Sequence, residues 1–273
     1  MKTIIAPVDF SKVSNNACLF AAKMAANIKA RLVLLHVQEL PAAVAEFPVS
    51  EEVFDSMNEE AEMENLKKQL LEATNNEITI ESKYILGSVE YELRQLCEQK
   101  KPVMIVMGTH SYGALDRFLL GSKTLFSARH LNYPVLVVPP NAEFKPFKRI
   151  ALASDLKDVY RVPVHEIEML VKHFDAGLDI YYAGKNQDEM SRHTLGDMLL
   201  EGKLEHLNAK FHFIENKDVM KGVSSLARKN NTDLLIIIPK KHGLFHKSQS
   251  KDFILYSEVP VLAIHEDDTM DLD

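Results

Sequence analysis

KTIIAPVD at residues 2–9 and KRIALASD at residues 148–155 are the two segments that decide the fold of this chain. Each runs from a lysine through a short apolar stretch to an aspartate, with the same separation. Further segments of the first half have counterparts in the second half in the same order, and the serine-to-proline spacing of 122–134 recurs at 248–260. Correspondence in both order and spacing indicates an internal duplication. The 273 residues therefore contain two copies of one unit.

Short apolar runs alternate with helical patterns along each copy. In the first copy the runs are 3–8, 31–37, 77–86, 102–107 and 134–139, with helical spacing at 15–30, 50–74, 88–99 and 122–131. Most runs are continuously apolar, which is typical of strands covered on both faces by helices. A β-α-β-α order predicts an α/β fold with a parallel sheet and right-handed crossovers. The proline-rich segment 139–147 reads as a linker, so we expect domains at 1–140 and 147–267.

Composition narrows the classes of partner. A net charge of −7 opposes binding to nucleic acid or to an anionic membrane surface. No apolar run approaches the roughly 20 residues that span a bilayer, and the N-terminus does not resemble a signal peptide. Cys18 and Cys97 lie far apart in helical segments, which favours buried free thiols over a disulfide. We therefore expect a cytoplasmic protein.

Polar residues that directly follow strands are the candidates for a ligand site, because open parallel sheets bind ligands beyond the carboxyl ends of their strands. Asp9 follows the first strand and could bind a ligand hydroxyl or amino group. The alternative is that Asp9 only caps the start of the next helix. Ser11 is the N-cap candidate for a helix that begins at Lys12.

The loop after the fourth strand is the second candidate. It begins at Gly108 and ends in Gly121 and Ser122, which open a helix. The N–H groups of Gly121, Ser122 and Lys123, together with the hydroxyls of Ser122 and Thr124, could hold phosphate oxygens. The loop contains neither a Walker A motif nor G-x-G-x-x-G, so a plain turn with a helix cap is the competing interpretation.

Five segments of the first copy, taken together, resemble the universal stress protein family: IIAPVDFS, LVLLHV, IVMGTH, FLLGS and YPVLVV. The second copy resembles the same domain more weakly, which implies a tandem member. The resemblance implies a doubly wound five-stranded parallel sheet in each copy, with strand order 3-2-1-4-5 and helices on both faces. Family domains often dimerise through the last strand. We therefore expect the two last strands to pair inside one chain as a pseudo-dimer, with a homodimer as the other possibility.

ATP-binding members of that family carry the loop pattern G-x-x-G, nine residues, then G-[ST]. Gly108, Gly121 and Ser122 match it, and the intervening residues 112–120 have the right number. Ser111 stands where the pattern has its second glycine. If that position needs a left-handed backbone or close phosphate approach, serine lowers affinity about tenfold. The other contacts implied by the resemblance, to the base and ribose of ATP bound with Mg²⁺, fall on Pro7, Val8, Asp9, Val37 and Met107.

The second copy departs from this pattern. Lys240 and Lys247 replace the two matching glycines, and the loop between the matching histidine and serine is six residues shorter. Asp155 persists, but we expect no ATP site of the family type there. The lysines and His242 and His246 could bind an anion or a metal, or form a solvated basic loop.

Three functions remain open from the sequence. The first is a regulatory stress protein that binds an adenine nucleotide in its first copy, with at most slow hydrolysis. The second is a stress module that acts only through an unknown protein partner, which Ser111 favours. The third is an enzyme such as a nucleotide-dependent ligase or hydrolase, for which no general base, nucleophile or metal set is recognisable. His36, His110 and His130 lack a nucleophile at a recognisable spacing, so we expect them to be structural.

Overall fold

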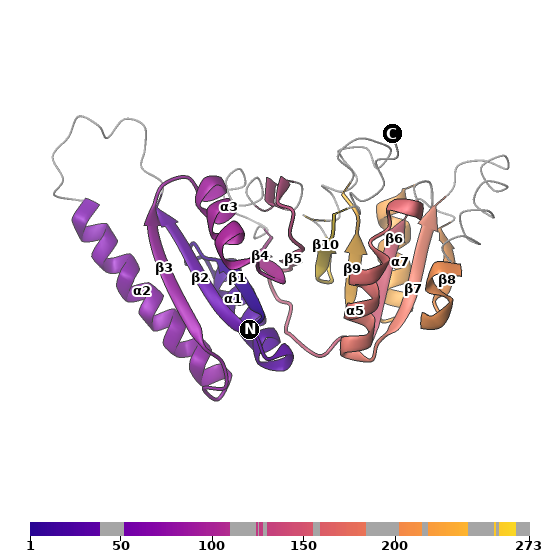
Figure 1. The fold of residues 1–273 in the computed structure, drawn as a ribbon, viewed down its shortest axis with the longest axis horizontal. Coiled ribbons are helices and arrows are strands. Elements are labelled where there is room, and N and C mark those ends of the chain that lie inside the picture. The colour runs from indigo at the N-terminus through magenta and orange to yellow at the C-terminus, as the bar shows by residue number, and fades with distance from the viewer. Residues whose placement is uncertain are drawn as a thin grey trace. The chain divides into compact units, whose positions relative to one another are not determined.

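The computed structural model describes residues 1–38, 52–109, 124, 126–127, 130–154, 159–183, 202–214, 218–239, 254 and 257–265. The chain divides into two compact units, Met1–Lys145 and Pro146–Asp273 (Figure 1). The division falls inside the proline-rich segment that reads as a linker.

The first unit is a parallel sheet with strand order β3-β2-β1-β4-β5. Its strands are β1 (Thr3–Pro7), β2 (Arg31–Gln38), β3 (Ile80–Leu86), β4 (Met104–Gly108) and β5 (Val135–Val138), and its helices are α1 (Lys12–Ile28), α2 (Glu52–Ala73) and α3 (Val89–Lys100). The predicted α/β class and the strand order 3-2-1-4-5 are confirmed.

The second unit repeats this order as β8-β7-β6-β9-β10, and its neighbouring strands are again parallel. Its strands are β6 (Arg149–Ser154), β7 (Gly177–Ala183), β8 (Lys210–Ile214), β9 (Leu234–Ile237) and β10 (Val261–Ala263). Its helices are α5 (Val164–Phe174), α7 (Val219–Lys229) and the short 3-10 helices η2 (Val159–Arg161) and η3 (Glu205–Leu207).

Helices cover both faces of the first sheet. The chain steps from β1 through β2 to β3 in one direction and returns to β4 in the other, so right-handed crossovers place α1 and α2 on one face and α3 on the opposite face. In agreement, α1 contacts α2 as well as the strands, whereas α3 contacts β1 and β2. The strands between these helices are almost wholly buried, which explains their continuous apolar runs.

The start of α1 follows the predicted capping chemistry. Ser11 is the N-cap, and its hydroxyl accepts a hydrogen bond of 3.1 Å from the N–H of Ser14. The buried side of α1 consists largely of small residues: Ala17, Cys18, Ala21, Ala22 and Ala25. Small side chains allow the helix backbone to approach the sheet closely. The first turn of α1 therefore leaves little space for a side chain at the last residue of β4, Gly108.

The long helix α2 packs on β3 and α1 through an apolar stripe. Met63, Leu66 and Leu70 are each at most 5 % exposed and recur at helical spacing. The helical spacing predicted for residues 50–74 is therefore present, and its apolar side covers the sheet.

Candidate functional site

The carboxyl ends of β1, β2 and β4 meet at one edge of the first sheet (Figure 1). Pro7 is in register with Leu35, and the pairing of Ile5 with Ile105, continued by two residues, places Pro7 beside Met107. The N–H of Val8 extends this ladder by donating to the Leu35 carbonyl at 2.8 Å. The predicted site residues Val8, Asp9, Val37, Met107 and Gly108 therefore follow or end strands at the same edge.

Asp9 has a structural role at this edge, but that role uses only part of its carboxylate. Its Oδ1 atom accepts a hydrogen bond of 3.1 Å from the N–H of Ser11, and its own N–H donates to the Ser14 hydroxyl at 3.2 Å. Asp9 is exposed, and its Oδ2 atom has no hydrogen-bond partner among the described residues. Asp9 thus stabilises the turn that leads into α1 through Oδ1, while its Oδ2 atom stays accessible to a ligand hydroxyl.

Phe10, the next residue, adopts a left-handed backbone with φ of 60°. For a residue with a Cβ this conformation costs about 1 to 2 kcal/mol, and it is uncommon for an aromatic residue. The Phe10 ring lies against the imidazole of His36, with ring centroids 4.7 Å apart. This contact offsets the backbone strain and fixes the turn that carries Asp9.

His36 is the centre of a buried polar cluster behind this turn. The residue is 6 % exposed, and its Nδ1 atom lies 2.8 Å from the Val8 carbonyl oxygen. Its Nε2 atom lies 3.3 Å from Glu59 Oε2 on α2, an ion-pair distance without the geometry of a hydrogen bond. The hydroxyl of Tyr84 on β3 lies 2.7 Å from the same Glu59 oxygen and 2.6 Å from Gln38 Oε1. The cluster joins β1, β2, β3 and α2.

Gly108 is required by packing against α1. A Cβ atom built on Gly108 would lie 2.7 Å from Val13 Cγ1 and 2.9 Å from the Val13 backbone oxygen. Contacts under 3.0 Å to a backbone atom cannot be relieved by a side-chain rotation. The glycine that opens the candidate loop therefore lets β4 end directly against the first turn of α1.

Of the other predicted loop residues, the structure describes Thr124. Thr124 is fully buried, and its hydroxyl donates to the Gly108 carbonyl at 3.1 Å. The hydroxyl expected to hold a phosphate oxygen is therefore engaged by the chain itself and ties the two ends of the loop together. The residues predicted between them, Ser111, Gly121, Ser122 and Lys123, lie outside the described residues.

The two cysteines are free and buried, as their positions predict. Burial raises the pKa of the Cys18 thiol to about 12, and the charge of the nearby Asp9 adds to this effect. Burial likewise raises the pKa of Cys97 to about 12. Both thiols are therefore held in the protonated, weakly nucleophilic form.

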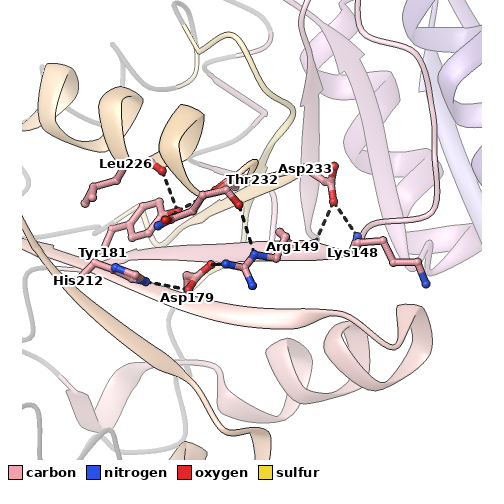
Figure 2. A network of polar contacts seen from close by, with 9 residues as sticks. Lys148, Arg149, Asp179, Tyr181, His212, Leu226, Thr232 and Asp233 are labelled. Atoms are coloured by element: carbon pink, nitrogen blue, oxygen red, sulfur yellow. Dashed lines mark hydrogen bonds and ion pairs between the residues drawn. The ribbon is translucent and has the colours of Figure 1, made fainter.

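The second unit contains a polar network that the sequence did not predict (Figure 2). Asp179 on β7 is 1 % exposed, with Oδ1 at 2.8 Å from His212 Nε2 and Oδ2 at 3.5 Å from Arg149 Nη2. Nearby, the Tyr181 hydroxyl lies 2.8 Å from that of Thr232. Asp179 stands where strand register places Val33 in the first unit, so the second copy has exchanged an apolar core position for a carboxylate.

This network lies away from the edge at which parallel sheets bind ligands. Arg149 is the first residue of β6, and Asp179 pairs with Ala151 in the first half of the strand. The Asp233 carboxylate accepts from the N–H groups of Lys148 and Arg149 at 2.7 and 2.9 Å and fixes the entry into β6. The network joins the amino-terminal half of the sheet to the residues after α7. Asp155 and residues 240–248, the counterparts of the first site, lie outside the described residues.

Among the described residues, no group of three or more His, Cys, Asp or Glu side chains is arranged to hold a metal ion. In the same residues, no helix is both long and apolar enough to cross a membrane.

The strand order and the edge at which β1, β2 and β4 end define an α/β protein with the same doubly wound strand order in both units, whose candidate ligand site follows the central strands of the first. The model of the universal stress protein family matches residues 1–139, which is just over half of the sequence. The chain belongs to the universal stress protein family.

Relatives agree with this assignment. Universal stress protein MJ0531 of Methanocaldococcus jannaschii is 32 % identical over 139 residues, covering 50 % of this chain and 81 % of the relative. Universal stress protein MJ0577 of the same organism is 31 % identical over 156 residues, covering 50 % of this chain and 94 % of the relative. A crystal structure of a universal stress protein from Archaeoglobus fulgidus has a TM-score of 0.73 and covers 96 % of this chain and 98 % of that chain. Its identity of 18 % shows the shared fold alone.

Proposed function

We propose that the first unit binds an adenine nucleotide, ATP with Mg²⁺, at the carboxyl edge of its sheet, and that the protein acts as a regulatory stress protein in the cytoplasm. The observation that carries this proposal is the convergence of the ends of β1, β2 and β4 beside Asp9. The Asp9 carboxylate has an oxygen with no hydrogen-bond partner among the described residues, which suits a ribose hydroxyl.

The roles divide between the strand ends and the loop. Pro7, Val8 and Asp9 lie near the base and ribose, and Val37 and Met107 flank the base. The backbone of Gly108, Ser111, Gly121, Ser122 and Lys123 surrounds the phosphates. In sequence the loop keeps the length and two of the three glycines of the family pattern. Nucleotide occupancy would alter the loop from Gly108 to Ser122 and so change a surface that a protein partner contacts, with at most slow hydrolysis of the nucleotide.

Calorimetric titration of the full chain with ATP and magnesium tests the proposal. We expect saturable binding that Asp9→Ala weakens and Gly121→Asp abolishes. Asp155→Ala is the matched control, because it removes the corresponding aspartate of the second copy and should leave the affinity unchanged. Absence of binding at millimolar ATP would reject the proposal.

The second candidate function is a stress module that acts by protein interaction without a nucleotide. Ser111 favours it, because this residue departs from the glycine of ATP-binding members. If that candidate is correct, the natural chain binds ATP poorly and Ser111→Gly raises the affinity by about tenfold or more. If Ser111→Gly leaves an already measurable affinity unchanged, Ser111 is not the reason to prefer this candidate.

The pairing of the two last strands within one chain stays a prediction. Intramolecular pairing would cover one of the two edge strands of each sheet and leave the chain monomeric, whereas pairing between chains would give a homodimer. Sedimentation velocity distinguishes the two, and a stable homodimer would contradict the intramolecular arrangement.

A further inference from the structure

We propose that His36 is a positioning residue for Asp9, and that Glu59 extends this control to helix α2. The inference rests on the proposed nucleotide site at the same edge and adds to it the buried side chains that set the site's geometry. Neither residue is expected to contact the nucleotide.

His36 holds the chain on both sides of Asp9. On one side its Nδ1 atom lies 2.8 Å from the Val8 carbonyl oxygen. A carbonyl oxygen can only accept, so Nδ1 carries a proton and donates it. On the other side the imidazole packs against the Phe10 ring at 4.7 Å. A single buried side chain thus fixes the residues immediately before and after the aspartate.

The left-handed backbone of Phe10 makes this support necessary. With φ of 60°, Phe10 turns the chain sharply between the end of β1 and the N-cap of α1. A residue with a Cβ relaxes toward negative φ unless its surroundings hold it. Loss of the hydrogen bond that His36 Nδ1 donates to the Val8 carbonyl would therefore let the turn relax and move the Asp9 carboxylate away from the position that the neighbouring strand ends define.

Glu59 supports His36 from the opposite side. With Nδ1 donating to the Val8 carbonyl, the Nε2 atom on the other edge of the ring faces the Glu59 carboxylate, 3.3 Å from Oε2. The Tyr84 hydroxyl, 2.7 Å from the same oxygen, fixes the carboxylate in place. A shift of α2 relative to β2 would therefore act on His36 and, through it, on Asp9.

Substitutions at position 36 can separate the hydrogen bond to the Val8 carbonyl from the ring contact with Phe10. In His36→Asn the amide nitrogen replaces Nδ1 and can still donate to the Val8 carbonyl, whereas His36→Leu removes this donor. We expect His36→Leu to lower ATP affinity about tenfold and His36→Asn to stay within about threefold of the natural chain. His206→Leu is the control, since His206 in the second unit lies the same 3.3 Å from Glu168 and is exposed.

Helix α2 is tested with Glu59→Ala, which should lower ATP affinity about threefold. Glu64→Ala is its control, because Glu64 lies on the same helix and is two-thirds exposed beside Lys67. An unchanged affinity for Glu59→Ala would overturn the link to α2.

The conformation of the turn can be read without any nucleotide. In NMR spectra of the full chain, left-handed Phe10 gives a strong nuclear Overhauser effect between its amide proton and its own Hα proton. We expect this signal to weaken in His36→Leu and to persist in His36→Asn. If it persists in both variants, or if both bind ATP like the natural chain, the positioning role is refuted. If neither the natural chain nor any variant binds ATP, the proposed function fails. The Phe10 signal then tests by itself whether His36 positions Asp9.

Discussion

Gly108→Ala tests the finding that β4 ends in direct contact with α1. The added methyl group would meet the Val13 backbone oxygen at 2.9 Å and Val13 Cγ1 at 2.7 Å. The side chain of Val13 can rotate, but the backbone oxygen can yield only if the first turn of α1 moves away from the sheet. Insertion of a methyl group into such a contact costs about 1 to 3 kcal/mol. For a unit of this size the unfolding midpoint should fall by about 3 to 10 °C.

Differential scanning calorimetry of the full chain measures this effect. Gly202→Ala is the matched control, because Gly202 lies in a helical segment where an added Cβ meets nothing within 4 Å. Alanine is the better helix former, so this control should melt at the same temperature as the natural chain or slightly above it. If Gly108→Ala melts within 1 °C of Gly202→Ala, our account of Gly108 is wrong.

Three further predictions concern capping, the second unit and the thiols. Ser11→Ala removes the N-cap of α1 and should cost about 1 kcal/mol of stability in denaturant titrations; an unchanged midpoint would argue against the cap. Asp179→Ala leaves Arg149 and His212 facing a buried gap and should destabilise the chain by about 2 to 4 kcal/mol, whereas Glu258→Ala at an exposed ion pair should leave the midpoint unchanged. Because the thiol pKa values of Cys18 and Cys97 rise from 9.0 to about 12, the folded chain keeps protons that the unfolded chain loses, so stability should fall as the pH rises from 9 toward 12. Both thiols should also resist Ellman's reagent at pH 8 until the chain unfolds, and rapid labelling of the folded chain would contradict their burial.

Much of the fold could be predicted because strands that are buried on both faces of the sheet consist of continuous apolar residues. Continuous apolar runs such as those of β1, β4 and β9 have no solvent face, and their order along the chain fixes the parallel topology. The third strand of the second unit, β8, was not placed by the repeat. Its first four residues are exposed or half-buried and only Ile214 is buried, so it lacks the apolar run that marks the others.

The site was predicted less completely, since its support comes from residues far apart in the sequence. The carboxyl end of the first strand located Asp9, whereas Val37 and Met107 followed only from the resemblance to the universal stress protein family. Nothing in the local pattern relates His36 to Glu59, because their contact exists only once α2 has packed beside β2 and β3. The role of Gly108 was likewise hidden, because the residue that excludes a side chain there is Val13 on α1.

The network around Asp179 did leave a signal in the sequence. Comparison of the two copies places an aspartate in AGLDIYYAG where ARLVLLHVQ has Val33, and an acidic residue within a buried strand requires partners. Strand register then brings His212 beside Tyr181, with Arg149 opposite Gly177. The duplication thus predicts where to look for such partners, and the structure supplies their identity.

The number of adenine nucleotides bound per chain tests the central claim most directly. Equilibrium dialysis of the full chain against labelled ATP with magnesium, at saturation, measures it. We predict one nucleotide per chain, lost in Gly121→Asp, because only the first copy keeps the loop between Gly108 and Ser122 at the length of the family pattern. No bound nucleotide would contradict the proposed function, and two per chain would contradict the loss of the site in the second copy.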